Sequence, residues 1–280
     1  MMMSRPTTLL LLLPAVLLVG LLFIVPIVGI LGLSVHDDAG FTMAPVRELL
    51  ESRVALVVLE RTFWLALTVT AICLVLGYPA AYFMSGLRPK VRAYVTYLIL
   101  LPFWISILIR TYTWIVVLGR EGVVNRLLGS IGLSPVQILY TDTAVRIGMV
   151  QILLPIVILT CLASMLDIDR GLIKAARSLG ATPAQAFLKV FLPLSLSGVA
   201  TGGIICFILS LGFFVTPALL GGRRSIIIAN LIDIQVHQTL NWGFAAVLAS
   251  ALLIVTLACL GLFRLATRGR AEFSGAGLGR

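Results

Sequence analysis

Basic and small residues gather in a polar stretch, residues 167–193, that separates two long apolar runs. Asp169 is placed to cap a helix over residues 170–179, and Gly180 follows where many helices end in the left-handed conformation that glycine adopts easily. Thr182 followed by Pro183 is typical of the start of a second helix. The stretch therefore predicts a helix, a tight turn and a second helix that returns to the next apolar run.

One face of the first predicted helix combines apolar and very small side chains, because residues three or four positions apart share a helix face. The members of this face are Leu172, Ala175, Ala176 and Leu179. The two alanines remove bulk, so another surface could approach closely, and Lys174 and Arg177 flank them with positive charge. The pattern fits a docking element for a second protein. It fits equally an amphipathic segment on lipid headgroups, which basic residues also favour.

Residues spaced for catalysis or metal binding are missing from the sequence. It has no G-x-x-x-x-G-K-[ST] phosphate loop, and none of the lysines, Lys90, Lys174 and Lys189, follows such a glycine frame. His36 and His237 are far apart, and the 4 cysteines lie in apolar runs without metal-binding spacing. We therefore expect neither an enzyme nor a bound metal or cofactor.

The elements that position these residues are apolar helices. The chain of 280 residues is 60% hydrophobic and 11% charged, with a mean hydropathy of +1.12. Six apolar runs have about the length that a helix needs to cross the hydrocarbon core. They cover residues 9–33, 62–85, 93–118, 144–166, 194–216 and 243–266. The sequence thus predicts an all-α polytopic membrane protein with six transmembrane helices.

The distribution of Lys and Arg predicts the orientation of these helices. Basic residues gather in both terminal segments and in the connections after the second and fourth runs, whereas acidic residues gather in the other connections. Cytoplasmic segments are enriched in Lys and Arg, so both termini and residues 167–193 are expected in the cytoplasm. The net charge of +10 then reflects topology, and its scatter over short loops argues against nucleic-acid binding.

Prolines and glycines interrupt several runs. Pro79, Pro102 and Pro155 predict kinks, which membrane helices tolerate where neighbouring groups satisfy the freed backbone. Gly198 and Gly202 have the spacing that lets two helices approach closely. That spacing is more typical of ordinary helix packing than of a dimer contact.

Four short runs of residues carry a resemblance to a known family. The run KAARSLGA at residues 174–181, with Leu192 and Pro193 beginning twelve residues beyond Gly180, resembles the EAA loop of permease subunits of binding-protein-dependent ABC importers. Lys174 departs from the motif, which has Glu at this place. The runs PFW at 102–104, RTYTW at 110–114 and FVTPALLGG at 214–222 resemble the spermidine/putrescine-type branch.

The resemblance implies a type I-like ABC importer transmembrane domain in the bacterial inner membrane. Its expected partners are a cytoplasmic ABC ATPase dimer, a second permease subunit that is identical or homologous, a periplasmic solute-binding protein and the lipid bilayer. We divide the chain into an N-terminal span with a periplasmic segment (1–61), a permease core (62–266) and a cytoplasmic tail (267–280). The residues expected to couple to the ATPase are Leu172, Lys174, Ala175, Ala176, Leu179, Gly180 and Pro193.

A second set of residues could line the solute path. It comprises Arg110, Tyr112, Trp114, Phe213, Phe214, Thr216 and Asp233. Arginine at membrane depth is costly and often functional, although near the end of a span it can snorkel to the interface. Tyr112 and Trp114 could stack on a cation or belong to the interfacial aromatic belt.

The solute class stays open between a polyamine, an opine and an amino-acid-like compound. A polyamine path should offer carboxylates, yet none lies within the six runs, and the nearest is Asp233. Phe213 stands where the resemblance suggests an acid. The alternative is a secondary transporter that needs no ATPase, for which an inverted repeat and buried ionisable groups would be expected.

Overall fold

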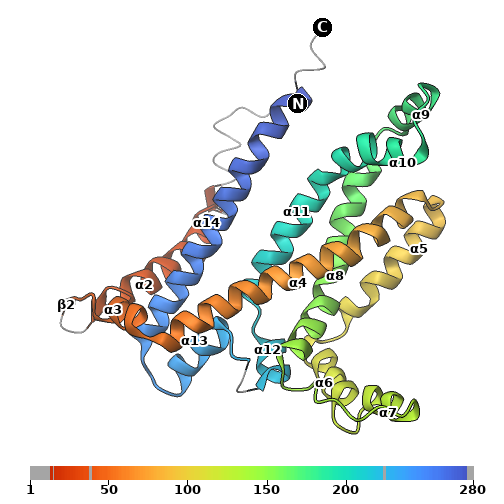
Figure 1. The fold of residues 1–280 in the computed structure, drawn as a ribbon. Helices are drawn as coiled ribbons and strands as arrows, with labels where there is room; N and C mark the ends of the chain where they lie inside the picture. The colour runs from red at the N-terminus through yellow and green to blue at the C-terminus, as the bar shows by residue number, and fades with distance from the viewer. Residues whose placement is uncertain (1–12, 15, 38–39, 223–224, 276–280) are drawn as a thin grey trace. The chain divides into compact units, whose positions relative to one another are not determined.

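The computed structural model describes residues 13–14, 16–37, 40–222 and 225–275, of which residues 266–275 are described by their backbone alone (Figure 1). The chain forms two compact units. The first unit comprises Met1–Leu59 and Leu231–Leu257, and the second comprises Glu60–Asn230 and Ala258–Arg280. Most of the motifs discussed above belong to the second unit.

The first unit contains helices and one small hairpin. Its apolar helix Val16–Leu33 includes the π-helical turn η1 (Gly20–Ile24) and α2 (Val25–Leu33). Strands β1 (His36–Asp37) and β2 (Gly40–Phe41) pair antiparallel and precede α3 (Ala44–Glu51). The N-terminal part of α14 (Trp242–Gly275) also lies in this unit. Residues 9–12 of the first predicted run lie outside the described residues.

The second unit is built from helices of very different lengths. The long ones are the main part of α4 (Arg53–Gly86), α8 (Asp142–Leu166) and α11 (Leu192–Leu211). The shorter ones are α5 (Pro89–Leu100), η2 (Leu101–Trp104), α6 (Ile107–Leu118), α7 (Val123–Ser130), α9 (Arg170–Ser178), α10 (Pro183–Ala186), η3 (Phe187–Phe191) and α12 (Val215–Leu220). Helix α13 (Ile228–His237) begins here and continues into the first unit.

Within the described residues, 5 helices are long and apolar enough to span a membrane. They are Val16–Leu33, Arg53–Gly86, Asp142–Leu166, Pro183–Leu211 and Trp242–Leu265. A sixth span exists if the bent pair Pro89–Trp104 and Ile107–Ser130 is taken as one. The prediction of a polytopic helical membrane protein is therefore confirmed, with five or six candidate spans.

The predicted third span, residues 93–118, is wrong as a single continuous helix. The chain bends by 90° between Trp104 and Ile107. Pro102 lies in a tight 3₁₀ turn, and Ile105 then adopts an extended conformation with φ −90° and ψ 132°. Because proline has no N–H to continue an α-helical ladder, the helix ends here and a new one begins after Ser106. The expected kink at Pro102 is thus a complete break.

Two other span limits differ from the prediction. Helix α4 begins at Arg53, nine residues before the start of the predicted run 62–85, so Glu60 and Arg61 belong to the same helix. Helix α11 ends at Leu211, and α12 begins only at Val215, so the run 194–216 is interrupted. Gly212 and the two phenylalanines after it supply this break. Hydropathy alone did not locate it because all these residues are compatible with hydrocarbon.

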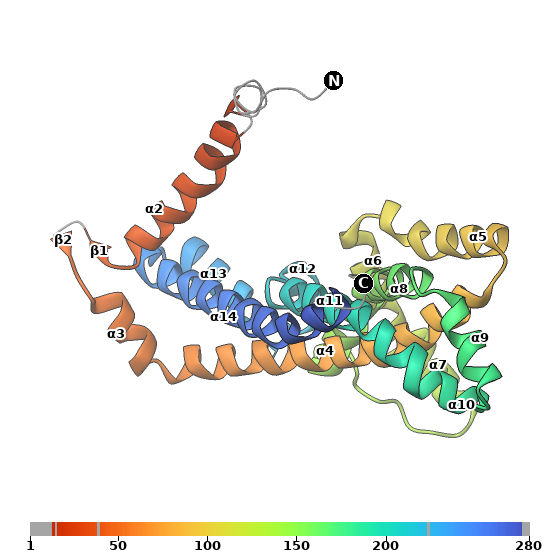
Figure 2. The same ribbon diagram turned by 90° about the horizontal axis from the view of Figure 1, so that it is seen from above.

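Helices α8 and α11 pack side by side in both views (Figures 1 and 2). A Cβ atom at Gly202 would lie 2.7 Å from Thr160 Oγ1, and one at Gly198 would lie 2.5 Å from Ser164 Cβ. The hydroxyls of Ser164 and Ser197 also form a hydrogen bond of 2.8 Å. The predicted close packing of the two glycines is therefore confirmed, and its partner is a helix of the same chain.

We expect Gly202→Val to destabilise the protein, because the added side chain would overlap Thr160. Overpacking of a tight contact typically costs about 1–3 kcal/mol. The measurement is the thermal unfolding midpoint in detergent. Gly261→Val is the matched control, since a Cβ there meets no atom within 4 Å. Equal midpoints for the two variants would contradict the assigned packing.

Candidate functional site

The polar stretch between α8 and α11 forms the predicted helix, turn and second helix. The Asp169 carboxylate accepts a 2.7 Å hydrogen bond from the Gly171 amide and so caps α9. Gly180 adopts φ +90°, and its neighbour Ala181 donates from its amide to the Ala176 carbonyl at 3.0 Å. This is a glycine-terminated helix end, in which the left-handed residue satisfies carbonyls that would otherwise be free. The predictions that Asp169 caps the helix and that Gly180 ends it are confirmed.

The second helix is capped at its N-terminus and continues into a wider turn. Thr182 and Gln185 form a reciprocal capping box, in which the Gln185 amide donates to the Thr182 hydroxyl at 3.3 Å and the Thr182 amide donates to Gln185 Oε1 at 2.9 Å. The chain then widens into the π-helical turn η3 before Pro193. Proline cannot donate a backbone hydrogen bond and its ring crowds the preceding turn, which accounts for the wide turn at this place. Helices α9 and α10 thus lie beyond the adjoining ends of α8 and α11 (Figure 1).

The predicted apolar face of α9 lies open on the surface. Leu172 is half-exposed, and 90% of the Leu179 side chain is exposed. Ala176, Leu179 and Gly180 form part of the wall of a shallow hollow of about 370 Å³, completed by residues of α10 and η3. We call this hollow the outer hollow. A leucine that is almost fully exposed beside two small residues is the kind of surface that a partner protein covers.

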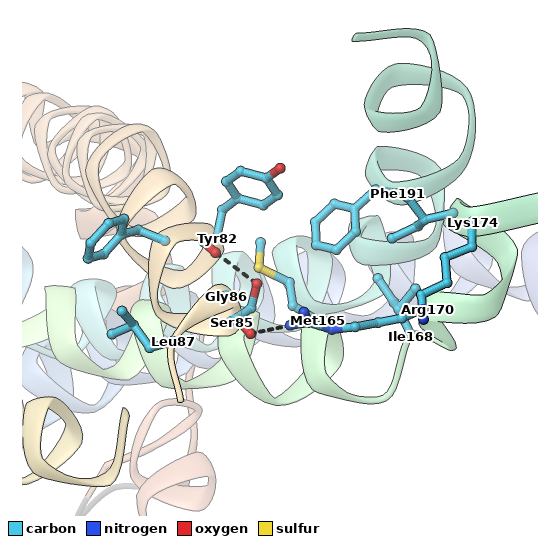
Figure 3. Close-up of a pocket in the computed structure, with 11 residues that line it drawn as sticks. Tyr82, Ser85, Gly86, Leu87, Met165, Ile168, Arg170, Lys174 and Phe191 are labelled. Carbon is cyan, nitrogen blue, oxygen red and sulfur yellow. Dashed lines mark hydrogen bonds between the residues drawn. The ribbon is translucent and has the colours of Figure 1, made fainter. Parts of the chain in front are cut away.

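Lys174 lies in a different hollow from Ala176. Together with Arg170 and Ile173 it lines a second hollow, of about 510 Å³, which we call the inner hollow (Figure 3). The opposite wall comes from the C-terminal end of α4, including Tyr82 and Ser85, and from Leu87 directly after it. Lys174 precedes the Ala175–Ala176 pair in the sequence. In the helix, however, Lys174 lines the inner hollow, whereas Ala176 lines the outer hollow.

Arg170 and an aromatic cluster connect the loop to α4. The Arg170 guanidinium donates a hydrogen bond to the Ser85 carbonyl. The Tyr82 ring lies 5.1 Å from both Phe187 and Phe191, measured between ring centroids, and the two phenylalanines stack at 5.8 Å. Sequence reasoning missed these contacts. The four-residue spacing of Arg170 and Lys174 could have indicated a second face of α9, but nothing in the sequence pointed to α4.

Thr216 lies at a junction of three helices. Its hydroxyl is 3.4 Å from the Thr111 hydroxyl of α6, and both residues are buried. A Cβ at Gly148 of α8 would lie 2.7 Å from the Thr216 methyl. Thr216, one of the residues predicted for the solute path, therefore lies buried where α12 meets α6 and α8.

Arg110 carries a buried polar atom without a partner. Its Nε–H group donates to no acceptor among the described residues, while the guanidinium carbon lies 5.9 Å from the centroid of the Phe103 ring. Arg146 Nε is likewise buried and unpartnered in the described part of the chain. Tyr112 is exposed, and Trp114 packs partly buried against the core. Arg110 thus has a buried N–H group that could donate to a further acceptor.

The remaining path residues have ordinary structural contacts. Phe213 packs against the core, and the Phe214 carbonyl accepts a 3.2 Å hydrogen bond from the Asn230 amide. Asp233 belongs to the other unit, where its carboxylate lies 3.0 Å from His237 Nδ1 one helical turn later. The carboxylate nearest to the predicted path in the sequence therefore has a partner on its own helix.

The sequence matches a family of known proteins and individual members of it. A family model described as "Binding-protein-dependent transport system inner membrane component" matches residues 73–269. The spermidine/putrescine transport system permease protein PotB of Escherichia coli is 36% identical over 200 residues, which cover 71% of this chain and 73% of PotB. PotB of Haemophilus influenzae is 38% identical over 188 residues, covering 66% of each chain.

A solved transporter shares the fold of this chain. A solved bacterial ABC transporter for import of the acidic polysaccharide alginate has a chain that superposes with a TM-score of 0.71. The match covers 92% of this chain and 95% of that chain at 21% identity, which shows a shared fold. The chain therefore belongs to the family of inner membrane components of binding-protein-dependent transport systems, and it is the transmembrane permease subunit of an ABC importer.

Proposed function

We propose that this permease forms one half of a solute pathway and that an ABC ATPase dimer drives it through residues 167–193. The other half would be a second permease subunit, identical or homologous, and a periplasmic solute-binding protein would deliver the solute. The observation that carries the proposal is the outer hollow, where Leu179 is 90% exposed beside Ala176 and Gly180. An exposed apolar surface at the end of a rigid helix pair suits a partner that moves it.

The proposed topology has six spans and both termini in the cytoplasm. It treats the bent pair Pro89–Trp104 and Ile107–Ser130 as one interrupted span. The basic residues at both termini and in α9 support this orientation. The chain would then consist of an N-terminal span with a periplasmic segment (1–61), the permease core (62–266) and a cytoplasmic tail (267–280).

Membership of the permease family decides between the two functions considered from the sequence. Inner membrane components of these importers are not themselves enzymes, and ATP is hydrolysed on a separate chain. This agrees with the missing phosphate loop in the sequence. The secondary transporter is therefore set aside in favour of the ABC importer subunit.

The proposed coupling residues would act at three places: the outer hollow, the inner hollow and the start of α11. Leu172, Ala175, Ala176, Leu179 and Gly180 would meet the ATPase at and beside the outer hollow. Pro193 would set the angle at which the loop returns to α11, because the wide turn η3 precedes it. Lys174 would act from the inner hollow, where it affects how α9 is seated on α4.

The solute is proposed to be a small polar compound: a polyamine, an opine or an amino-acid-like molecule. The names of the PotB relatives support a polyamine. Arg110, with its unpartnered Nε, and Phe213 do not favour a polycation. Acidic residues of the second permease subunit could supply the missing negative charge. Tyr112, Trp114, Phe214 and Thr216 stay proposed path residues on the strength of the resemblance.

We expect Ala176→Glu and Gly180→Leu to abolish co-purification of a P-loop ATPase with the tagged protein in mild detergent. The glutamate would place a charge in the outer hollow, and leucine is strained at φ +90°, where side chains other than glycine cost about 1–2 kcal/mol. Ala184→Glu is the matched control, since Ala184 is exposed in the same loop but outside the hollow. The measurement is mass-spectrometric identification of bound partners.

Two results would count against this proposal. Recovery of the wild-type protein without any ATPase would remove the importer coupling itself. Recovery of the ATPase at equal levels with wild type and both variants would remove the outer hollow as its docking surface.

Polyamine transport through this subunit predicts that Asp233→Asn lowers putrescine uptake in reconstituted vesicles by roughly tenfold, because a hydrogen bond to a charged group is worth about 1.5–3 kcal/mol. His237→Gln is the matched control, because it removes the partner at 3.0 Å and keeps the carboxylate. Uptake that stays unchanged in Asp233→Asn would remove Asp233 from the path.

A further inference from the structure

The inner hollow combines an apolar wall with two positive charges (Figure 3). Apolar side chains of Met165, Ile168 and Phe191 form part of its wall. Leu87, directly after α4, lines the hollow as well. Arg170 and Lys174 extend into the same space from α9, as their labelled side chains show in Figure 3. None of the residues that line this hollow is acidic.

The two cations repel each other unless an anion lies between them. They are four residues apart on α9, and like charges at this spacing destabilise a helix. Arg170 has a neutral acceptor, the Ser85 carbonyl, and no described ion pair includes Lys174. The nearest carboxylate in sequence, Asp169, is engaged in capping the Gly171 amide. Glutamate, the residue of the EAA motif at position 174, would have paired with Arg170 at this same spacing.

The hollow lies where lipid headgroups are expected. The candidate spans Arg53–Gly86 and Asp142–Leu166 both end at its rim. Phosphate groups of a bilayer lie just outside the hydrocarbon core, where membrane-spanning helices end. Basic residues at the ends of spans attract anionic lipids, and basic pockets between membrane helices bind their headgroups.

We propose that the inner hollow binds one anionic phospholipid, with its phosphate between Arg170 and Lys174 and an acyl chain along Met165, Ile168 and Phe191. The mixed lining favours a lipid over a soluble anion, because an inorganic phosphate would leave the apolar wall exposed to water. The bound lipid would neutralise the two charges and connect α9 to the end of α4. It would therefore hold the coupling helix against the membrane core.

The test is lipid binding to the detergent-purified chain, measured by native mass spectrometry during titration with phosphatidylglycerol. Wild type should retain one phosphatidylglycerol, and Lys174→Glu should bind it roughly tenfold more weakly, because each basic residue near an anionic lipid adds appreciable attraction. Lys174→Glu can pair with Arg170 at i,i+4 spacing, so it is expected to fold. Lys90→Glu is the matched control, with the same charge change at an exposed position of α5 outside the hollow.

Three outcomes would overturn the proposal. Lys174→Glu could bind phosphatidylglycerol as well as wild type and Lys90→Glu do. Phosphatidylcholine could be retained equally, which would leave a hydrophobic groove without charge selectivity. Millimolar inorganic phosphate could displace the lipid, which would indicate a site for a soluble anion. The measurement needs no ATPase, so its result is independent of the coupling proposed above.

Discussion

The close contact of α8 and α11 is the constraint on which the rest of the second unit depends. Inside a bilayer there is little hydrophobic force between helices, so association relies on close packing and on hydrogen bonds between polar side chains. Gly198 and Gly202 provide the first, and the Ser164–Ser197 hydrogen bond provides the second. Because α8 leads into the loop and α11 leads out of it, this contact also sets the distance that α9 and α10 must bridge.

The loop is fixed at more points than a connection between spans requires. Its helices are capped by Asp169 and Thr182, and its base is attached to α4 by Arg170 and by the aromatic cluster around Tyr82. A segment that transmits force has to be stiff in itself and firmly joined to the part that moves. Motion of α9 would therefore reach α4 directly, and α4 is a helix of 34 residues.

The two faces of α9 have different surroundings. The face with Ala176 and Leu179 is exposed and suits a protein partner, whereas the face with Arg170 and Lys174 is directed to the end of α4. The replacement of the motif glutamate by Lys174 changes the second face. The same replacement leaves Ala175, Ala176 and the turn at Gly180 in agreement with the EAA motif.

The sequence by itself determined the membrane class, the helix–turn–helix at residues 167–193, the residues that cap it and the family. These properties follow from local rules: run length, cap chemistry and the left-handed preference of Gly180. Only the tertiary structure decided that the third span breaks by 90° after Pro102, that Thr216 is enclosed by α6 and α8, and that Lys174 and Arg170 share a hollow with α4. Such features depend on contacts between residues far apart in the chain, and neither hydropathy nor spacing records which helices meet.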